Sequence, residues 1–356
     1  MEEIFFIQNY YYYLTAFICL LTFLSFSGYL SNKLPHRFIT VTVILFALFT
    51  AFYIGGRSSN IGTDTPRYEQ AFRFYESAQR FIIRKDVFYD LLSYSFSRLL
   101  GFQELLVFCA SIYILGALYS FRKIFKNDFY LPFIVFLISP YFFTSGINVM
   151  RSGVAASLFL VGLGVYYDKR KLAKTVFWFL GSVFFHISMV VPLLFFVIAR
   201  YLKNTKIIFV CWLFSILLGI LNINVIQAVV ESLGIFESRV GDYAVNEGER
   251  NFWVNFGIFG VIPVVFAVFN VLFLKYRDDF YIWLLNGYML THIPYIILLN
   301  SQFALRLGYL AEFMMPILLV FPLVISPKIV LRFKNLKIMV VLLVVFLIKA
   351  YKILII

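Results

Sequence analysis

The chain reads Arg57-Ser58-Ser59-Asn60-Ile61-Gly62-Thr63-Asp64-Thr65-Pro66-Arg67-Tyr68 between its second and third apolar runs. This polar stretch cannot continue a membrane helix, because its backbone groups need partners that hydrocarbon does not supply. Thr65 and Pro66 predict the start of a helix. Asp64 lies just before that start, where a carboxylate either caps the helix or is available for chemistry. Both roles for Asp64 stay open on this stretch alone.

Outside this stretch the chain is apolar almost throughout. Of its 356 residues 62% are hydrophobic and 14% are charged, whereas a soluble chain has about 45–50% apolar and about 25% charged residues. About 20 apolar residues cross a hydrocarbon core, and ten candidate spans lie at residues 10–30, 38–54, 102–121, 129–144, 149–167, 207–221, 254–275, 280–299, 305–325 and 336–355. We predict an all-α, polytopic transmembrane bundle of about 10–12 membrane segments.

The bundle is expected to be a single membrane domain, residues 1–356, with outward-facing loops at 55–101 and 222–253. The cysteines, Cys19, Cys109 and Cys211, lie in apolar runs without metal-ligand spacing. No phosphate-binding loop or metalloprotease motif is present either. We therefore expect no metal and no cofactor.

Residues 172–202 form an apolar run of unusual length, too long for one ordinary span and too short for two. His186 interrupts the run near its middle, and Lys/Arg clusters flank it on both sides. Positive residues favour the cytoplasmic side of short loops, so a single crossing would place one cluster on the wrong side. This pattern predicts a re-entrant or broken-helix hairpin with both ends in the cytoplasm and His186 near its tip.

With this hairpin, the remaining loops alternate between Lys/Arg-rich loops on the cytoplasmic side and loops on the outer side. Lys349 and Lys352 near the C-terminus are the exceptions. The net charge of +13 is then mainly a topology signal, and no nucleic-acid partner is needed to explain it.

On the outward side, ten of the eleven positive residues before the C-terminal span are arginine, with Lys85 as the exception. Topology requires only positive charge, whereas guanidinium groups hold phosphate oxygens bidentately. The arginine bias thus favours a phosphate ligand outside.

Four polar side chains at or inside the apolar runs are candidates for function. Arg151 and Arg306 lie at outer helix ends, where each is either a snorkelling anchor or a phosphate ligand. His186 is either a hydrogen-bonded core residue or a general base. Glu312 lies inside the same predicted helix as Arg306, and an intramembrane carboxylate is a functional candidate by default. His292, beside Pro294, is expected to be structural.

Several segments together resemble the EpsG family of Wzy-type polymerases of bacterial surface polysaccharides. The resemblance covers most of the chain, from about residue 10 to residue 325, and depends on the order of segments that are individually unspecific. The matching segments are Gly62-Thr63-Asp64-Thr65-Pro66-Arg67-Tyr68, Asn148-Val149-Met150-Arg151-Ser152-Gly153-Val154-Ala155, the basic turn at 169–174, Phe185-His186-Ile187-Ser188, and Arg306. Such a membership implies an enzyme that joins undecaprenyl-pyrophosphate-linked oligosaccharide units on the outer face of the inner membrane. It also allows a chain-length regulator protein as a partner, beside membrane lipids.

The resemblance implies a glycosyltransferase site, for which the residues suggest roles. We expect His186 and Asp64 to be catalytic, with the base assigned to His186 and the exchange of their roles as an alternative. Pyrophosphate contacts are predicted for Arg57, Arg67, Arg151 and Arg306, and sugar contacts for Tyr68, Asn148, Tyr309 and Glu312.

Two other functions are compatible with the same residues. A flippase for the same lipid-linked units would line its path with arginine and aromatic side chains, but it is expected to show two similar halves, which this sequence lacks. A membrane acyltransferase would place a histidine near arginines, but it is expected to draw on a cytoplasmic donor.

Overall fold

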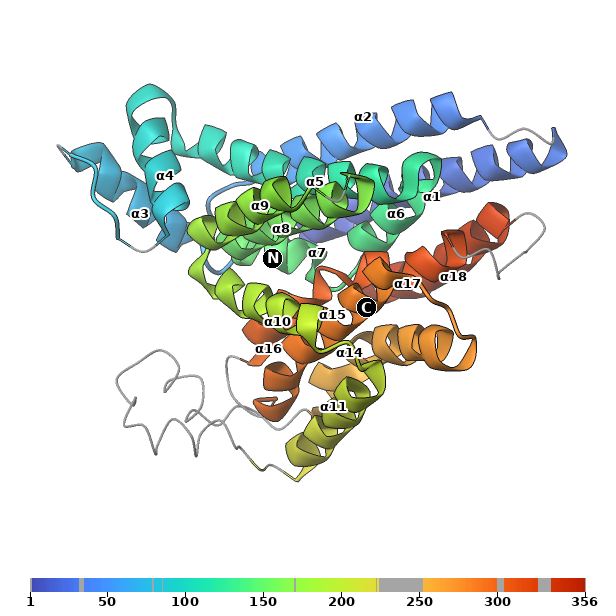
Figure 1. Ribbon diagram of the computed structural model, residues 1–356. Helices are drawn as coiled ribbons and strands as arrows, with labels where there is room; N and C mark the ends of the chain where they lie inside the picture. The colour runs from blue at the N-terminus through green and yellow to red at the C-terminus, as the bar shows by residue number, and fades with distance from the viewer. Residues whose placement is uncertain are drawn as a thin grey trace. The chain divides into compact units, whose positions relative to one another are not determined.

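A computed structural model describes residues 2–31, 35–78, 80–84, 86–169, 171–221, 223, 252–299, 304–325 and 334–355 (Figure 1). Within these ranges the chain is helical and contains no strand. The all-α prediction is therefore confirmed. Residues 224–251 of the predicted second outward loop lie outside the described residues.

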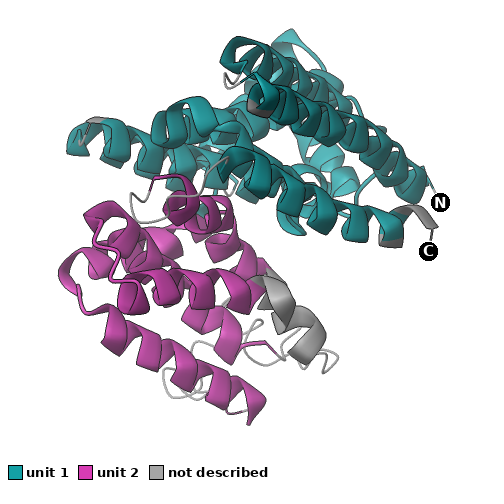
Figure 2. Ribbon diagram, turned by 90° about the vertical axis from the view of Figure 1, so that its right-hand side faces the viewer, with its two compact units in different colours: residues 1–187, 329–356 teal, residues 188–328 magenta. Residues whose placement is uncertain are grey.

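The chain divides into two compact units (Figure 2). Unit 1 consists of residues 1–187 and 329–356, and unit 2 of residues 188–328. The helices of unit 1 are α1 (Glu2–Leu30), α2 (His36–Gly55), α3 (Thr65–Ser77), α4 (Val87–Leu99), α5 (Phe102–Phe125), α6 (Tyr130–Ile138), α7 (Tyr141–Phe143), α8 (Met150–Lys169), α9 (Leu172–Phe185) and α18 (Lys334–Ile355). Those of unit 2 are α10 (Val190–Tyr201), α11 (Thr205–Ile220), α14 (Phe252–Val268), α15 (Asp279–Ile297), α16 (Ala304–Glu312) and α17 (Met315–Val324).

Five helical stretches in the described part of the chain are long and apolar enough to cross a membrane: Glu2–Gly28, His36–Gly55, Phe102–Asp128, Met150–Asp168 and Arg306–Val324. A bent helix pair adds a sixth candidate, and four further apolar helices are 10–17 residues long. The protein is thus a multi-pass membrane protein. The ten predicted spans correspond to a mixture of full-length and shorter helices.

One predicted span, residues 129–144, is broken in the structure. The segments Tyr130–Ile138 and Tyr141–Asn148 meet at an angle of 86°. The break follows from Pro140, which lacks an N–H and pushes the preceding residue out of helical geometry; Ser139 has φ −62° and ψ 148°. Lys349 of α18 donates from Nζ to the carbonyls of Ile138 (2.7 Å) and Ser139 (3.3 Å). The Ser139 carbonyl also accepts from the Phe142 N–H at 3.3 Å, so Lys349 adds a second donor at the bend between the two helical segments.

Helix α8 packs against α5 and α9 in unit 1. Small residues allow close approach of these helices, and their hydroxyls bind neighbouring backbones. Ser120 Oγ of α5 donates to the carbonyl of Leu160, and Ser182 Oγ of α9 donates to the carbonyl of Ala155, both at 2.6 Å. This packing fixes the N-terminal end of α8, which carries Arg151, and the C-terminal end of α9, which precedes His186.

The apolar run of residues 172–202 breaks at His186, as its length predicts. Helix α9 ends at Phe185, and His186 has an extended backbone with φ −154° and ψ 114°. A 3-10 turn, Ile187–Met189, and α10 follow. The sidedness of the two helices stays a prediction.

Labelling tests that sidedness. If both ends of the run are cytoplasmic, a cysteine at Lys171 and a cysteine at Lys203 will resist a membrane-impermeant maleimide added from the periplasm, and both will react after permeabilisation. A cysteine at Asn60, in the predicted outward loop, is the positive control. Reaction at Lys171→Cys or Lys203→Cys in intact cells would disprove the hairpin topology.

Candidate functional site

The polar stretch at 57–68 folds against the segment that leads into α8. Thr63 donates its backbone N–H to Asn148 Oδ1 at 2.8 Å, and the Tyr68 hydroxyl donates to the Asn148 carbonyl at 2.9 Å. Gly62 has φ +96°, and a Cβ at this position would lie 2.5 Å from Ile147. Only glycine fits this close approach without strain. Asn148, predicted to contact sugar, therefore anchors the polar stretch beside Arg151.

Arg57 lies inside this contact region, with 2% of its surface exposed. Its guanidinium donates to the carbonyls of Ile54 (2.8 Å) and Ile147 (3.2 Å) and to Thr65 Oγ1 (3.4 Å). Burial lowers the pKa of Arg57 to about 10, so the group stays charged at neutral pH. These hydrogen bonds link the end of α2, the start of α3 and the segment before α8. The predicted pyrophosphate contact of Arg57 stays a prediction.

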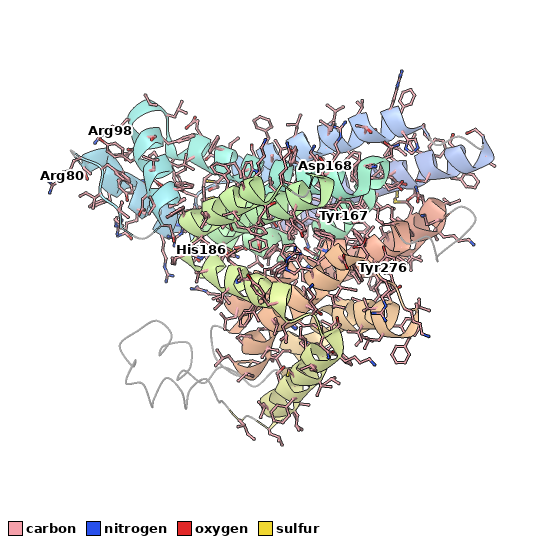
Figure 3. The ribbon with its side chains drawn as sticks, in the orientation of Figure 1. Arg80, Arg98, Tyr167, Asp168, His186 and Tyr276 are labelled. Atoms are coloured by element: carbon pink, nitrogen blue, oxygen red, sulfur yellow. The ribbon has the colours of Figure 1, made fainter. Side chains whose placement is uncertain are left out.

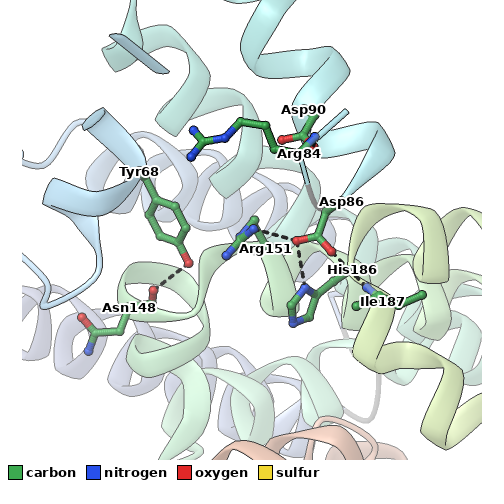
Figure 4. A network of polar contacts seen from close by, with 8 residues as sticks. All are labelled: Tyr68, Arg84, Asp86, Asp90, Asn148, Arg151, His186 and Ile187. Atoms are coloured by element: carbon green, nitrogen blue, oxygen red, sulfur yellow. Dashed lines mark hydrogen bonds and ion pairs between the residues drawn. The ribbon is translucent and has the colours of Figure 1, made fainter. Parts of the chain in front are cut away.

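Asp86, which the sequence did not single out, brings Arg151 and His186 together (Figure 4). Arg151 Nη1 lies 2.7 Å from Asp86 Oδ2, and His186 Nδ1 lies 3.2 Å from the same oxygen. The Ile187 N–H donates to Asp86 Oδ1 at 3.2 Å. We name Asp86, Arg151 and His186 the Asp86 cluster. The Asp86 side chain is fully buried, whereas Arg151 is 22% and His186 is 18% exposed.

The charge of Asp86 fixes the tautomer of His186. Burial raises the pKa of Asp86, but the hydrogen bond and charge of His186, the charge of Arg151 and the Ile187 N–H outweigh it, so the pKa is lowered. Asp86 is therefore ionised at neutral pH and can only accept hydrogen bonds. Nδ1 of His186 must then donate to it. Nε2 has no hydrogen-bond partner in the described residues, so the ring is held at Nδ1 by a carboxylate and is open at Nε2, which is the arrangement of a general base.

Arg151 lies between two tyrosine rings. The centre of its guanidinium is 5.5 Å from the ring of Tyr68 and 5.4 Å from that of Tyr89, distances at which cation–π attraction operates. Burial raises the pKa of Tyr68, with Arg151 opposing the shift, so the ring stays a neutral phenol. Tyr68, predicted to contact sugar, thus supports Arg151. Among the described residues, Arg151 Nε has no hydrogen-bond partner.

The loop that carries Asp86 is held by α3 and α4. The Arg84 N–H donates to Asp90 Oδ2 at 2.8 Å, and the Tyr75 hydroxyl donates to the Ile82 carbonyl at 2.9 Å. Asp90 also donates its own N–H to the Asp86 carbonyl at 2.8 Å. Asp86 precedes α4 just as Asp64 precedes α3, and this shared position before a helix is the only sequence signal that marks it.

The other predicted site residues are described each within its own unit. Asp64 pairs with Arg67 at 3.4 Å, the Arg67 side chain is 77% exposed, and no described contact joins Asp64 to His186. Arg306, Tyr309 and Glu312 lie on α16 in unit 2; Arg306 is exposed and Glu312 is buried. Their roles, like that of Asp64, stay predictions. In the part of the chain that the structure describes, no group of three or more histidine, cysteine or acidic residues could hold a metal ion.

Gly153 allows the first turn of α8 to approach the preceding segment. A Cβ at this position would lie 2.2 Å from the Ser145 carbonyl oxygen, and a backbone atom cannot move aside as a side chain can. We expect Gly153→Ala to lower the free energy of unfolding by about 1–3 kcal/mol and to displace Arg151. Thermal unfolding in lipid nanodiscs measures the change. Gly181→Ala on α9 is the matched control, because no atom of the described residues lies within 4 Å of its Cβ position. Equal unfolding midpoints for the two variants would contradict the close approach.

Comparison with known proteins supplies a family. Searches of curated proteins and of solved structures found no significant match. The model of the EpsG family matches residues 40–356, a range that includes the polar stretch, the whole Asp86 cluster and all of unit 2. Because this match covers far more than half of the chain, the chain belongs to the EpsG family.

Proposed function

We propose that this protein polymerises undecaprenyl-pyrophosphate-linked oligosaccharide units into surface polysaccharide on the outer face of the bacterial inner membrane. Membership in the EpsG family supports a membrane protein of polysaccharide biosynthesis. The observation that carries the enzymatic part is the Asp86 cluster, in which an ionised carboxylate orients a histidine whose Nε2 is unpaired in the described residues. This arrangement supports a side chain that takes a proton from a hydroxyl group.

In the proposed step, His186 is the general base. Nε2 takes the proton of a sugar hydroxyl on the acceptor unit while the hydroxyl oxygen attacks the anomeric carbon of the donor glycan. The bond between that carbon and the pyrophosphate oxygen breaks, and undecaprenyl pyrophosphate leaves with the electron pair. The imidazolium then returns the proton to water or to the leaving group. Asp86 stabilises the imidazolium, because its carboxylate lies 3.2 Å from Nδ1.

Arg151 has two functions in this proposal. Its Nη1 holds Asp86 in place. The other N–H groups of its guanidinium donate hydrogen bonds to a pyrophosphate oxygen. We further propose that Arg67 and Arg306 contact the pyrophosphates, that Tyr309 and Glu312 contact sugar, and that Asp64 orients the acceptor. These assignments follow from the sequence pattern.

Deletion of the gene separates polymerase from flippase. If the protein is the polymerase, cells will lose long surface glycans and keep a single repeat on the acceptor, since units still reach the outer face. If it is a flippase, all surface repeats will disappear. Unchanged glycan length with loss of acyl substituents would contradict both functions and indicate an acyltransferase. Complementation with the intact gene is the control.

A further inference from the structure

Helix α4 lies beside the first turns of a membrane span. The ring of Phe96 on α4 is 5.3 Å from that of Phe108 on α5. Phe108 is six residues into α5, which corresponds to about 9 Å along the helix axis. Phe88 of α4 also contacts Phe184, near the end of apolar helix α9, at 5.5 Å. Helix α4 therefore packs beside the N-terminal turns of the candidate span α5 and beside the end of the apolar helix α9.

Residues 80–84 precede Asp86 and expose three consecutive large apolar side chains. Phe81 is 36%, Ile82 40% and Ile83 57% exposed. These residues are not in a helix, so they are not part of a span. We name residues 80–84 the insertion segment. Leu99, at the end of α4, is 80% exposed, and Arg98 beside it donates to the Ala78 carbonyl just before the segment. An apolar surface of this kind outside a span needs a partner.

Arginines border the apolar side chains of the insertion segment. Arg80 and Arg84 flank them in sequence and are exposed. The guanidinium centre of Arg84 lies 4.7 Å from the Phe74 ring, and that of Arg98 lies 5.3 Å from the Tyr94 ring. Figure 3 shows Arg80 and Arg98 at the same end of unit 1. Apolar side chains with arginines at their edge fit the boundary between acyl chains and headgroups, where guanidinium binds lipid phosphates.

We propose that the insertion segment binds the lipid bilayer, with Phe81, Ile82 and Ile83 among the upper acyl chains and with Arg80 and Arg84 on phospholipid phosphates. Asp90 holds the Arg84 N–H at 2.8 Å and donates its own N–H to the Asp86 carbonyl. These two hydrogen bonds connect the segment to the Asp86 cluster through Asp90. The consequence rests on the proposed function: the cluster lies at the level of lipid phosphates, where the reacting end of a lipid-pyrophosphate donor is found.

Fluorescence quenching by lipids tests this surface in the full chain. A single cysteine replaces Ile83 in a background with Cys19→Ala, Cys109→Ala and Cys211→Ala, and carries a small fluorophore. Vesicles of phosphatidylcholine and phosphatidylglycerol contain lipids with a nitroxide either shallow or deep in the acyl chain. Gln70→Cys, on the exposed side of α3, is the aqueous control, and Leu45→Cys, which is 61% exposed within span α2, is the deep control.

We expect the label at Ile83→Cys to be quenched several-fold more by the shallow nitroxide than the label at Gln70→Cys, and less by the deep nitroxide than the label at Leu45→Cys. Adding Arg80→Gln and Arg84→Gln should reduce the shallow quenching. A label at Ile83→Cys that iodide quenches as strongly as the Gln70→Cys label would overturn the proposal. A label that neither iodide nor lipid reaches would overturn it as well, because protein would then cover the segment. This readout needs no activity, so its failure is distinguishable from failure of the polymerase proposal.

Discussion

Replacing His186 with glutamine is expected to lower polymer formation by about 10²–10⁴-fold, the contribution of a general base. Glutamine is similar in size and can still donate to Asp86, so the Asp86–Arg151 pair should persist. It cannot take a proton, and a sugar hydroxyl attacks slowly without a base. The measurement is the rate at which purified protein in vesicles converts lipid-linked repeat units into longer glycans, separated by gel electrophoresis. An unchanged rate would remove His186 from the reaction.

Asp86→Asn should have a smaller effect on the same rate. A hydrogen bond to a charged group is worth about 1.5–3 kcal/mol, and each 1.36 kcal/mol is tenfold in rate, so we expect a loss of about 10- to 150-fold. Because the pKa of Asp86 lies below its ordinary value of 3.8, the carboxylate is ionised at any higher pH. The pH profile above that value should thus contain no titration of Asp86. The matched control is Asp168→Asn, which removes a partly exposed carboxylate paired with Lys123 on the same unit. If both variants lower the rate of polymer formation equally, Asp86 has no special role in the reaction.

Arg151→Met should have the largest effect on stability. It removes the partner of a fully buried carboxylate at 2.7 Å, and breaking such a pair from one side costs about 3–5 kcal/mol. Asp86→Asn combined with Arg151→Met should cost less than the sum of the single changes, by about 0.5–3 kcal/mol, because no charge is left without its partner. Thermal unfolding of the four proteins in nanodiscs completes the cycle. Strict additivity would show that the pair does not couple.

Arg151→Lys separates the two proposed functions of this side chain. An ammonium keeps a positive charge beside Asp86, so most stability should remain. It cannot reproduce the planar fork of guanidinium, so activity should fall strongly if Arg151 also holds pyrophosphate. We expect the same loss of activity for Arg306→Lys. If both lysine variants still produce full-length polymer, the two arginines do not bind pyrophosphate and serve only as anchors at the helix ends.

Much of the fold follows from local sequence. The excess length of residues 172–202 and its polar interruption predicted the helix break at His186, because hydrocarbon thickness limits each span. Thr65 and Pro66 predicted the start of α3, which the structure places at Thr65. The bend at Ser139 was missed, because Pro140 was counted as part of an apolar run and its effect on the preceding residue was not weighed.

The site was predicted only in part. Arg151 and His186 were marked by their charge in apolar surroundings, but Asp86 is one of several acidic residues in a polar loop. It meets His186 across 100 residues of chain, and no local pattern predicts such a contact. Composition also could not separate Arg57, which is buried, from Arg67, which is exposed. The difference depends on which carbonyls the folded backbone presents.

The hydrogen bonds of Lys349 impose an order on biosynthesis. The carbonyls of Ile138 and Ser139 accept from a side chain that is 211 and 210 residues further along the chain. While the ribosome is still making the intervening residues, the bend that leads to Asn148 and Arg151 lacks these bonds. A nascent chain that has inserted only its earlier helices therefore holds this bend without the contribution of Lys349. Insertion of α18 then adds these two hydrogen bonds, so the bend reaches its full set of contacts late in synthesis.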